Sequence, residues 1–153
     1  MTRQRLILIA AFGSAALLTG AFGFQYIGGL WPYTLCLWQR WPHAAAILLG
    51  VLGMTLPQRI WPILGAVAAL VTAAIALFHV GVEQTWWEGL ATCTADTMGN
   101  VNVNDLLNTD VTVGAPVRCD AIAWTLFGIS MAGWNMLLST GLAVIWIKAA
   151  RKG

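Results

Sequence analysis

The sequence predicts an all-α membrane protein: one polytopic four-helix bundle with both termini cytoplasmic. Of its 153 residues, 59% are hydrophobic and only 9% are charged, whereas a soluble domain is about 25% charged. Four apolar runs reach or approach the roughly 20 residues that cross a bilayer as a helix. We place the four spans of this single domain at about residues 6–26, 38–56, 60–80 and 122–147.

The distribution of charge predicts the orientation. All six acidic residues lie between residues 81 and 121. Six of the eight basic residues lie near the other ends of the apolar runs: Arg3, Arg5, Arg59, Lys148, Arg151 and Lys152. The positive-inside rule makes these ends cytoplasmic, so residues 27–37 and 81–121 form outer loops. A net charge of +2 gives no reason to expect nucleic acid as a partner, and the two histidines lack zinc-site spacing, so we expect no metal.

The first span could be read as a signal peptide, and the second has an apolar run that is short for a bilayer. A cleaved signal peptide ending near Thr19-Gly20-Ala21 is the alternative for the first, but the apolar run continues past that site and more spans follow. The apolar run at residues 43–56 is short for a bilayer, so the second helix must extend back toward Cys36. Because proline is tolerated in a first turn and kinks a helix interior, Pro42 predicts a start near residues 37–41.

Proline, small residues and a capping residue mark the remaining elements. The third span has Pro62 in its first turn. Small residues four apart, Ala16 with Gly20 and Ala69 with Ala73, predict close helix contacts. In the long outer loop Asn104 could cap a short helix, although a plain loop fits equally well.

The three cysteines divide between the two outer loops. Cys93 and Cys119 share the long loop and are the natural pair in an oxidising compartment. Their bond is either a structural staple or an exchangeable disulfide. A polar loop without a packed core favours the second, since exposed disulfides are the labile ones. Cys36 is the remaining thiol.

Polar residues near Cys36 fit a redox site at the membrane surface. Arg40 shares a helix face with Cys36 if the helix begins early enough, and its guanidinium and the helix N-terminus would stabilise a thiolate. The alternatives are a buried apolar cysteine and a snorkelling arginine. Gln39 either contributes a hydrogen bond to this site or faces water. His79, at the outer end of the third span, is either part of this site or an interfacial residue.

The stretch Pro32-Tyr33-Thr34-Leu35-Cys36-Leu37-Trp38-Gln39-Arg40 resembles the Pro-Cys-x-Leu-Cys-x-x-Gln-Arg motif of the DsbB family, the quinone-reducing membrane thiol oxidases. Other stretches also look like parts of that family: residues 78–87, 91–94, 117–120 and 124–135. The resemblance covers most of the chain, and the order and spacing of these stretches make it specific.

The resemblance implies a relay in the bacterial inner membrane, with its active side in the periplasm. A reduced DsbA-type partner with a thioredoxin fold attacks the loop disulfide at Cys93. The released Cys119 attacks a second disulfide at the membrane edge. Cys36 then hands electrons to ubiquinone or menaquinone, with Arg40, Gln39 and His79 as quinone-binding residues.

Tyr33 stands where the family has the first cysteine of the membrane-edge pair. The second disulfide, which Cys119 would attack, is therefore missing from the relay. The chain is either an engineered or trapped form, which the otherwise intact motif favours, or a natural variant that has lost turnover. The alternative functions are a non-catalytic protein that binds quinone or partner and, less favoured because no acidic residue lies within a span, a small transporter subunit.

Overall fold

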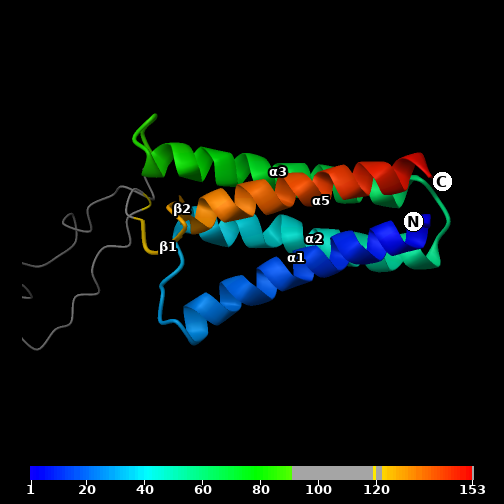
Figure 1. Ribbon diagram of the computed structural model, residues 1–153, viewed down its shortest axis with the longest axis horizontal. Coiled ribbons are helices and arrows are strands. Elements are labelled where there is room, and N and C mark those ends of the chain that lie inside the picture. The colour runs from blue at the N-terminus through cyan, green and yellow to red at the C-terminus, as the bar shows by residue number, and fades with distance from the viewer. Residues whose placement is uncertain (91–118, 120–121, 153) are drawn as a thin grey trace, which may run out of the picture.

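The chain forms a bundle of long helices in a computed structural model that describes residues 1–90, 119 and 122–152. The helices are α1 (Arg3–Tyr26), α2 (Thr34–Thr55), α3 (Ile60–Glu83) and α5 (Met131–Arg151). A short antiparallel hairpin, β1 (Thr125–Leu126) with β2 (Ile129–Ser130), precedes α5 (Figure 1). The predicted four-helix architecture is confirmed; the hairpin was not predicted.

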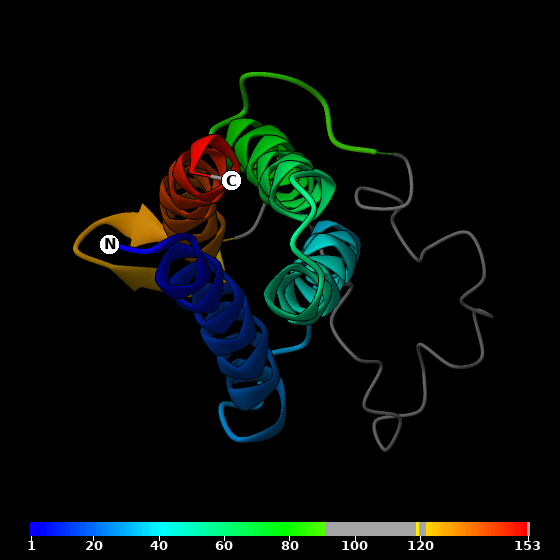
Figure 2. The ribbon, with the colours of Figure 1, turned by 90° about the vertical axis from the view of Figure 1, so that its right-hand side faces the viewer.

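Each helix packs against two others, which closes the bundle into a ring. Helices α1 and α3 each contact both α2 and α5 (Figure 2). Both termini and the turn between α2 and α3 lie at one end of the bundle, which we call the terminal end. The hairpin and the segment joining α1 to α2 lie at the opposite end, which we call the hairpin end.

Helix α2 begins earlier than predicted. It starts at Thr34 rather than near residues 37–41, and Pro42 lies inside it. Tyr33 is the extended N-cap residue, with φ −68° and ψ 157°. An interior proline is tolerated in membrane helices because other groups satisfy the freed carbonyl. The early start places Cys36 in the first turn of the helix.

Helix α5 begins later than predicted, at Met131 rather than near residue 122. Phe127 and Gly128 adopt positive φ angles of 53° and 76°, which turn the chain back into the hairpin. Ser130 then caps the helix, since its side chain accepts a hydrogen bond from the N–H of Gly133. Helix α3 runs on to Glu83, which the sequence had placed in the loop.

Large apolar side chains cover the outside of the bundle. Exposed examples occur on every one of these helices: Phe12 on α1, Leu48 on α2, Val67 and Leu70 on α3, and Leu137 and Val144 on α5. Apolar surface of this extent is a liability in water but the expected surface in lipid. By length and composition, α1 and α3 each suffice to cross a membrane. Helices α2 and α5, of 22 and 21 residues, are about 30 Å long at 1.5 Å per residue, which matches the hydrocarbon core of a bilayer.

Small residues allow the helices to approach around Trp146, which is fully buried. The backbone of Gly65 lies against its indole, so an added Cβ would fall 2.6–2.8 Å from ring atoms. Ala69 and Ala73 are buried on α3, as the predicted close contact requires. The other predicted pair is wrong, because Ala16 and Gly20 are exposed.

We predict that Gly65→Ala destabilises the protein by about 1–3 kcal/mol relative to Gly141→Ala, because the new methyl group overpacks Trp146. An added Cβ at Gly141 meets nothing within 4 Å, so that control experiences only the higher helix propensity of alanine. Thermal unfolding of both variants in detergent measures the difference. Equal midpoints would contradict the packing described for Trp146.

Candidate functional site

A cavity of about 300 Å³ lies at the hairpin end, bounded by α1, α2, α5 and the segments that join them. Residues of α1 between Ala16 and Phe24 line it, and this half of α1 diverges from the other helices (Figure 1). Its lining is mainly apolar: Leu17, Ala21, Phe24, Leu30, Trp31, Trp124, Met131 and Leu138 are examples. Cys36, Gln39, Arg40, His43 and Asn135 add polar groups. The cavity therefore suits an apolar ligand with a few polar atoms.

Cys36 carries a free thiol and lines this cavity. Its Sγ also lies 3.9 Å from Nδ1 of His79 on α3, within the longer distances of sulfur hydrogen bonds. Cys36 and Arg40 line the same cavity, as their four-residue spacing predicted. The thiol therefore has the cavity on one side and a buried imidazole on the other.

Arg40 is anchored to α1. Its Nη1 donates to Oε1 of Gln25 at 2.6 Å, and its Nη2 donates to the carbonyl of Ala21 at 3.4 Å. The guanidinium also lies over the ring of Phe22, 4.7 Å from the centroid. These contacts attach the diverging half of α1 to α2 and fix the cation on the cavity wall. Sequence reasoning did not identify the Gln25 contact, because the two helices' register is not visible in the chain.

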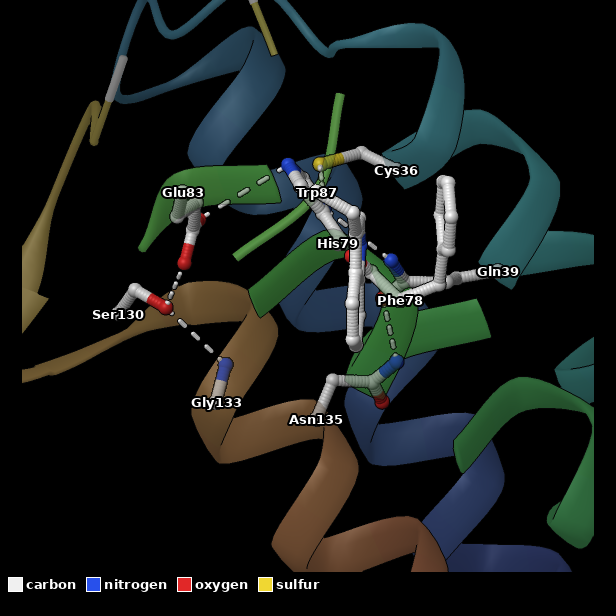
Figure 3. Close-up of polar contacts among 9 residues, drawn as sticks. All are labelled: Cys36, Gln39, Phe78, His79, Glu83, Trp87, Ser130, Gly133 and Asn135. Carbon is white, nitrogen blue, oxygen red and sulfur yellow. Dashed lines mark hydrogen bonds and ion pairs between the residues drawn. The ribbon is translucent and has the colours of Figure 1, made fainter. Parts of the chain in front are cut away.

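A buried hydrogen-bond network runs behind the cavity from α3 to α5 (Figure 3). Gln39 accepts a hydrogen bond from Nδ2 of Asn135 at 2.6 Å, and its Nε2 lies 3.3 Å from Nδ1 of His79. Oδ1 of Asn135 accepts from Ser139 at 3.1 Å and pairs with Nε2 of His43 at 2.9 Å. Both histidines thus belong to one network, although they are far apart in sequence.

A second contact holds the end of α3 to the start of α5. The hydroxyl of Ser130 donates to Oε2 of Glu83 at 2.5 Å and accepts from the N–H of Gly133 at 3.1 Å (Figure 3). The other oxygen of Glu83 lies 3.8 Å from Nε2 of His79, and the Glu83 side chain is only 4% exposed. The four-residue spacing of His79 and Glu83 signals this pair only once α3 is known to extend that far.

Trp87 covers this end of α3 from outside. Its indole N–H donates to the carbonyl of Phe78 at 3.0 Å, and the two rings stack at 5.8 Å. The indole also lies against Gly81, where an added Cβ would come within about 2 Å of it. Gly81 thus permits the indole to lie directly against α3, where Figure 3 shows it beside Phe78.

Tyr33 and Cys119 lie at the same end of the bundle. Tyr33 packs against a buried cluster of Leu35, Val82 and Cys119, and its ring meets that of His79 edge-on at 5.9 Å. Cys119 is fully buried and disulfide-bonded, and its backbone hydrogen-bonds with His79. The structure therefore brings Cys119 to the Tyr33–Cys36 segment.

Most residues singled out from the sequence meet in this region. Cys36, Gln39, Arg40 and Tyr33 line the cavity, whereas His79 lies behind Cys36. Cys93 lies outside the described residues. Sequence reasoning missed several participants: Gln25, His43, Thr72, Glu83, Ser130, Asn135 and Ser139.

Comparison with known proteins identifies the family. The profile described as "Disulfide bond formation protein DsbB" matches residues 3–149. Disulfide bond formation protein B of Acidovorax sp. (strain JS42) is 28% identical, over 97% of this chain and 90% of its own. Disulfide bond formation protein B 2 of Pseudomonas syringae pv. syringae (strain B728a) is 32% identical, over 92% and 83%.

Disulfide bond formation protein B of Methylococcus capsulatus is 30% identical, over 90% of each chain. No solved structure matches significantly. Since the family profile spans nearly the whole chain, this protein belongs to the DsbB family, whose members act in disulfide bond formation as helical membrane proteins.

Proposed function

We propose that this chain is a thiol:disulfide oxidoreductase that takes electrons from a periplasmic dithiol protein and passes them to a membrane quinone. The donor would be a DsbA-type oxidase with a thioredoxin fold, and the acceptor ubiquinone or menaquinone. The observation that carries the proposal is the free thiol of Cys36 on an apolar cavity that also holds the Arg40 guanidinium.

The cavity residues fit a quinone, which has an apolar ring and two carbonyl oxygens that accept hydrogen bonds. The volume of about 300 Å³ lies at the lower end of the usual range for small-molecule sites. Nε of Arg40 and Nδ1 of His43 are buried without a hydrogen-bond partner among the described residues, and such atoms are normally paired. Arg40 and Gln39 would hold the carbonyl oxygens. When bound, the quinone supplies the two-electron acceptor.

The positions of the basic residues support a periplasmic hairpin end in the bacterial inner membrane. Arg3 begins α1, Arg59 precedes α3, and Lys148 and Arg151 lie in the last turn of α5. Arg3 donates to the carbonyl of Gln58 at 2.7 Å, which joins two of these segments. Basic residues gather on the cytoplasmic side of membrane proteins, so the cavity would open toward the periplasm.

The entry of electrons would use a disulfide between Cys93 and Cys119. Its support is that Cys119 is disulfide-bonded while Cys36 is free. A thiolate of the partner attacks Cys93, and Cys119 leaves as a thiolate. The partner's second thiol then closes the partner's own disulfide. Two electrons and two protons have passed from the partner to Cys93 and Cys119.

Tyr33 prevents the relay from reoxidising Cys93 and Cys119 after this exchange. Reoxidation by the relay needs a second disulfide at the membrane edge, and a tyrosine cannot form one with Cys36. Tyr33 also packs against the cluster that contains Cys119. We therefore expect the chain as written to oxidise one equivalent of partner, or to stall as a mixed disulfide through Cys93.

The first test is Tyr33→Cys. This variant should oxidise many equivalents of a reduced DsbA-type partner with added quinone, because the missing disulfide is restored. Tyr33→Ser removes the same bulk without supplying a thiol, and should remain limited to one equivalent. Turnover by the unchanged chain as fast as by Tyr33→Cys would overturn the relay.

A second test concerns Arg40. Arg40→Met should weaken quinone binding about 10- to 100-fold, because a charge-assisted hydrogen bond contributes about 1.5–3 kcal/mol. Arg40→Lys should recover only part of the affinity, since it lacks the planar fork. Arg59→Met, at the terminal end, is the matched control. Unchanged quinone affinity in Arg40→Met, measured by titration in detergent, would leave Arg40 as an anchor for α1.

Tyr33 also favours a second candidate, a relative that binds quinone or partner without turnover. The same assays separate the two functions. Bound quinone together with no repeated thiol oxidation, even in Tyr33→Cys, would establish the binding role.

A further inference from the structure

Cys36 and His79 form a pair of groups between which a proton can move. Sγ of Cys36 lies 3.9 Å from Nδ1 of His79, and the His79 side chain is 1% exposed. Cys36 is the third residue of α2, where unpaired backbone N–H groups stabilise a thiolate. The two side chains come from neighbouring helices, α2 and α3, so the pair depends on the packing of the bundle (Figure 3).

The surrounding network determines which nitrogen of His79 is free to accept a proton. Nδ2 of Asn135 is a donor, so the Gln39 atom 2.6 Å away is the amide oxygen. The Gln39 amide nitrogen, also a donor, therefore faces Nδ1 of His79 at 3.3 Å. Nδ1 must then be the acceptor of the neutral ring, with the ring proton on Nε2. The acceptor nitrogen is the one that faces the Cys36 thiol.

The other side of the ring is suited to a positive charge. Nε2 lies 3.8 Å from Oε1 of Glu83, and Ser130 holds the second carboxylate oxygen at 2.5 Å. A carboxylate at this position would stabilise a protonated imidazole, because opposite charges attract strongly where water is excluded.

We propose that His79, supported by Glu83, is the proton acceptor that converts the Cys36 thiol into a thiolate. This inference rests on the proposed function, in which Cys36 is the electron-donating sulfur. The S–H bond of Cys36 breaks, an N–H bond forms at Nδ1 in place of the hydrogen bond that Nδ1 accepts from Gln39, and the electron pair stays on sulfur. The pair keeps its total number of protons and its net charge. His79 would thus act on the thiol, whereas the resemblance to the family implied a quinone-binding role.

The proton count gives the proposal a distinctive consequence. The neutral pair and the thiolate–imidazolium pair carry the same protons, so the fraction of thiolate formed by internal transfer does not depend on pH. A thiol without such a partner yields a thiolate fraction that rises about tenfold per pH unit below its pKa. Among the described residues, the other titratable groups around the pair are Tyr33, Arg40 and Glu83. The α5 side chains nearby, Ser130 and Asn135, do not titrate.

The test measures the rate of alkylation of Cys36 by iodoacetamide against pH, in purified full-length protein freed of quinone and without a reductant. The unchanged protein should show a rate that is nearly constant between about pH 6 and 8. His79→Gln keeps a hydrogen-bonding side chain but cannot accept the proton. Its rate should be about tenfold lower or more at pH 7 and rise about tenfold per pH unit.

Lys148→Gln is the control, because it removes a titratable group in the last turn of α5, at the terminal end of the bundle and away from the pair. It should keep the flat profile. Glu83→Gln should show an intermediate rate, since it removes the charge and keeps the shape. A steep profile in the unchanged protein, or a flat one in His79→Gln, would overturn the proposal. The assay needs neither partner nor quinone, so its failure is separate from failure of the relay, which the Tyr33→Cys assay measures.

Discussion

The hydrogen bond between Gln39 and Asn135, 2.6 Å long, connects α2 to α5 in the middle of an apolar bundle. In lipid, polar groups must find partners within the protein, and helix association has little hydrophobic driving force. Each member of the network therefore limits how the helices can rotate. Gln39 also reaches His79 on α3, and Asn135 reaches His43. The position of Cys36 against His79 follows from these contacts.

Arg40 fixes the position of α1 relative to α2, as the Gln39–Asn135 network does for the other helices. Near Ala11 and Gly50 the backbones of α1 and α2 come close, since an added Cβ at Gly50 would lie 2.5 Å from that of Ala11. Beyond this point α1 diverges, and the bonds from Arg40 to Gln25 and Ala21 hold it at a distance. The cavity is thus built into the packing: small residues close one half of the α1–α2 contact, and a long cation spans the other.

The bundle and part of the site could be predicted from the sequence alone. Apolar length identified α1 and α3, and the basic residues separated the two ends of the bundle. The motif around Cys36 pointed to the segment that lines the cavity. The start of α2 was misjudged because Pro42 was expected to lie in the first turn of the helix, whereas it lies in the helix interior. Glu83 was missed because its charge suggested a loop, whereas Ser130 satisfies it at a helix end. Asn135 and His43 pair across helices, which no local pattern reveals.

The relay and the proton transfer to His79 both depend on the division of the three cysteines into one free thiol and one disulfide. Alkylating the folded protein without reductant and mapping its peptides by mass spectrometry tests that division directly. This division predicts alkylation at Cys36 alone and a linked peptide pair containing Cys93 and Cys119. A disulfide that includes Cys36 would contradict it, because the thiol assigned to the cavity and to His79 would then not exist.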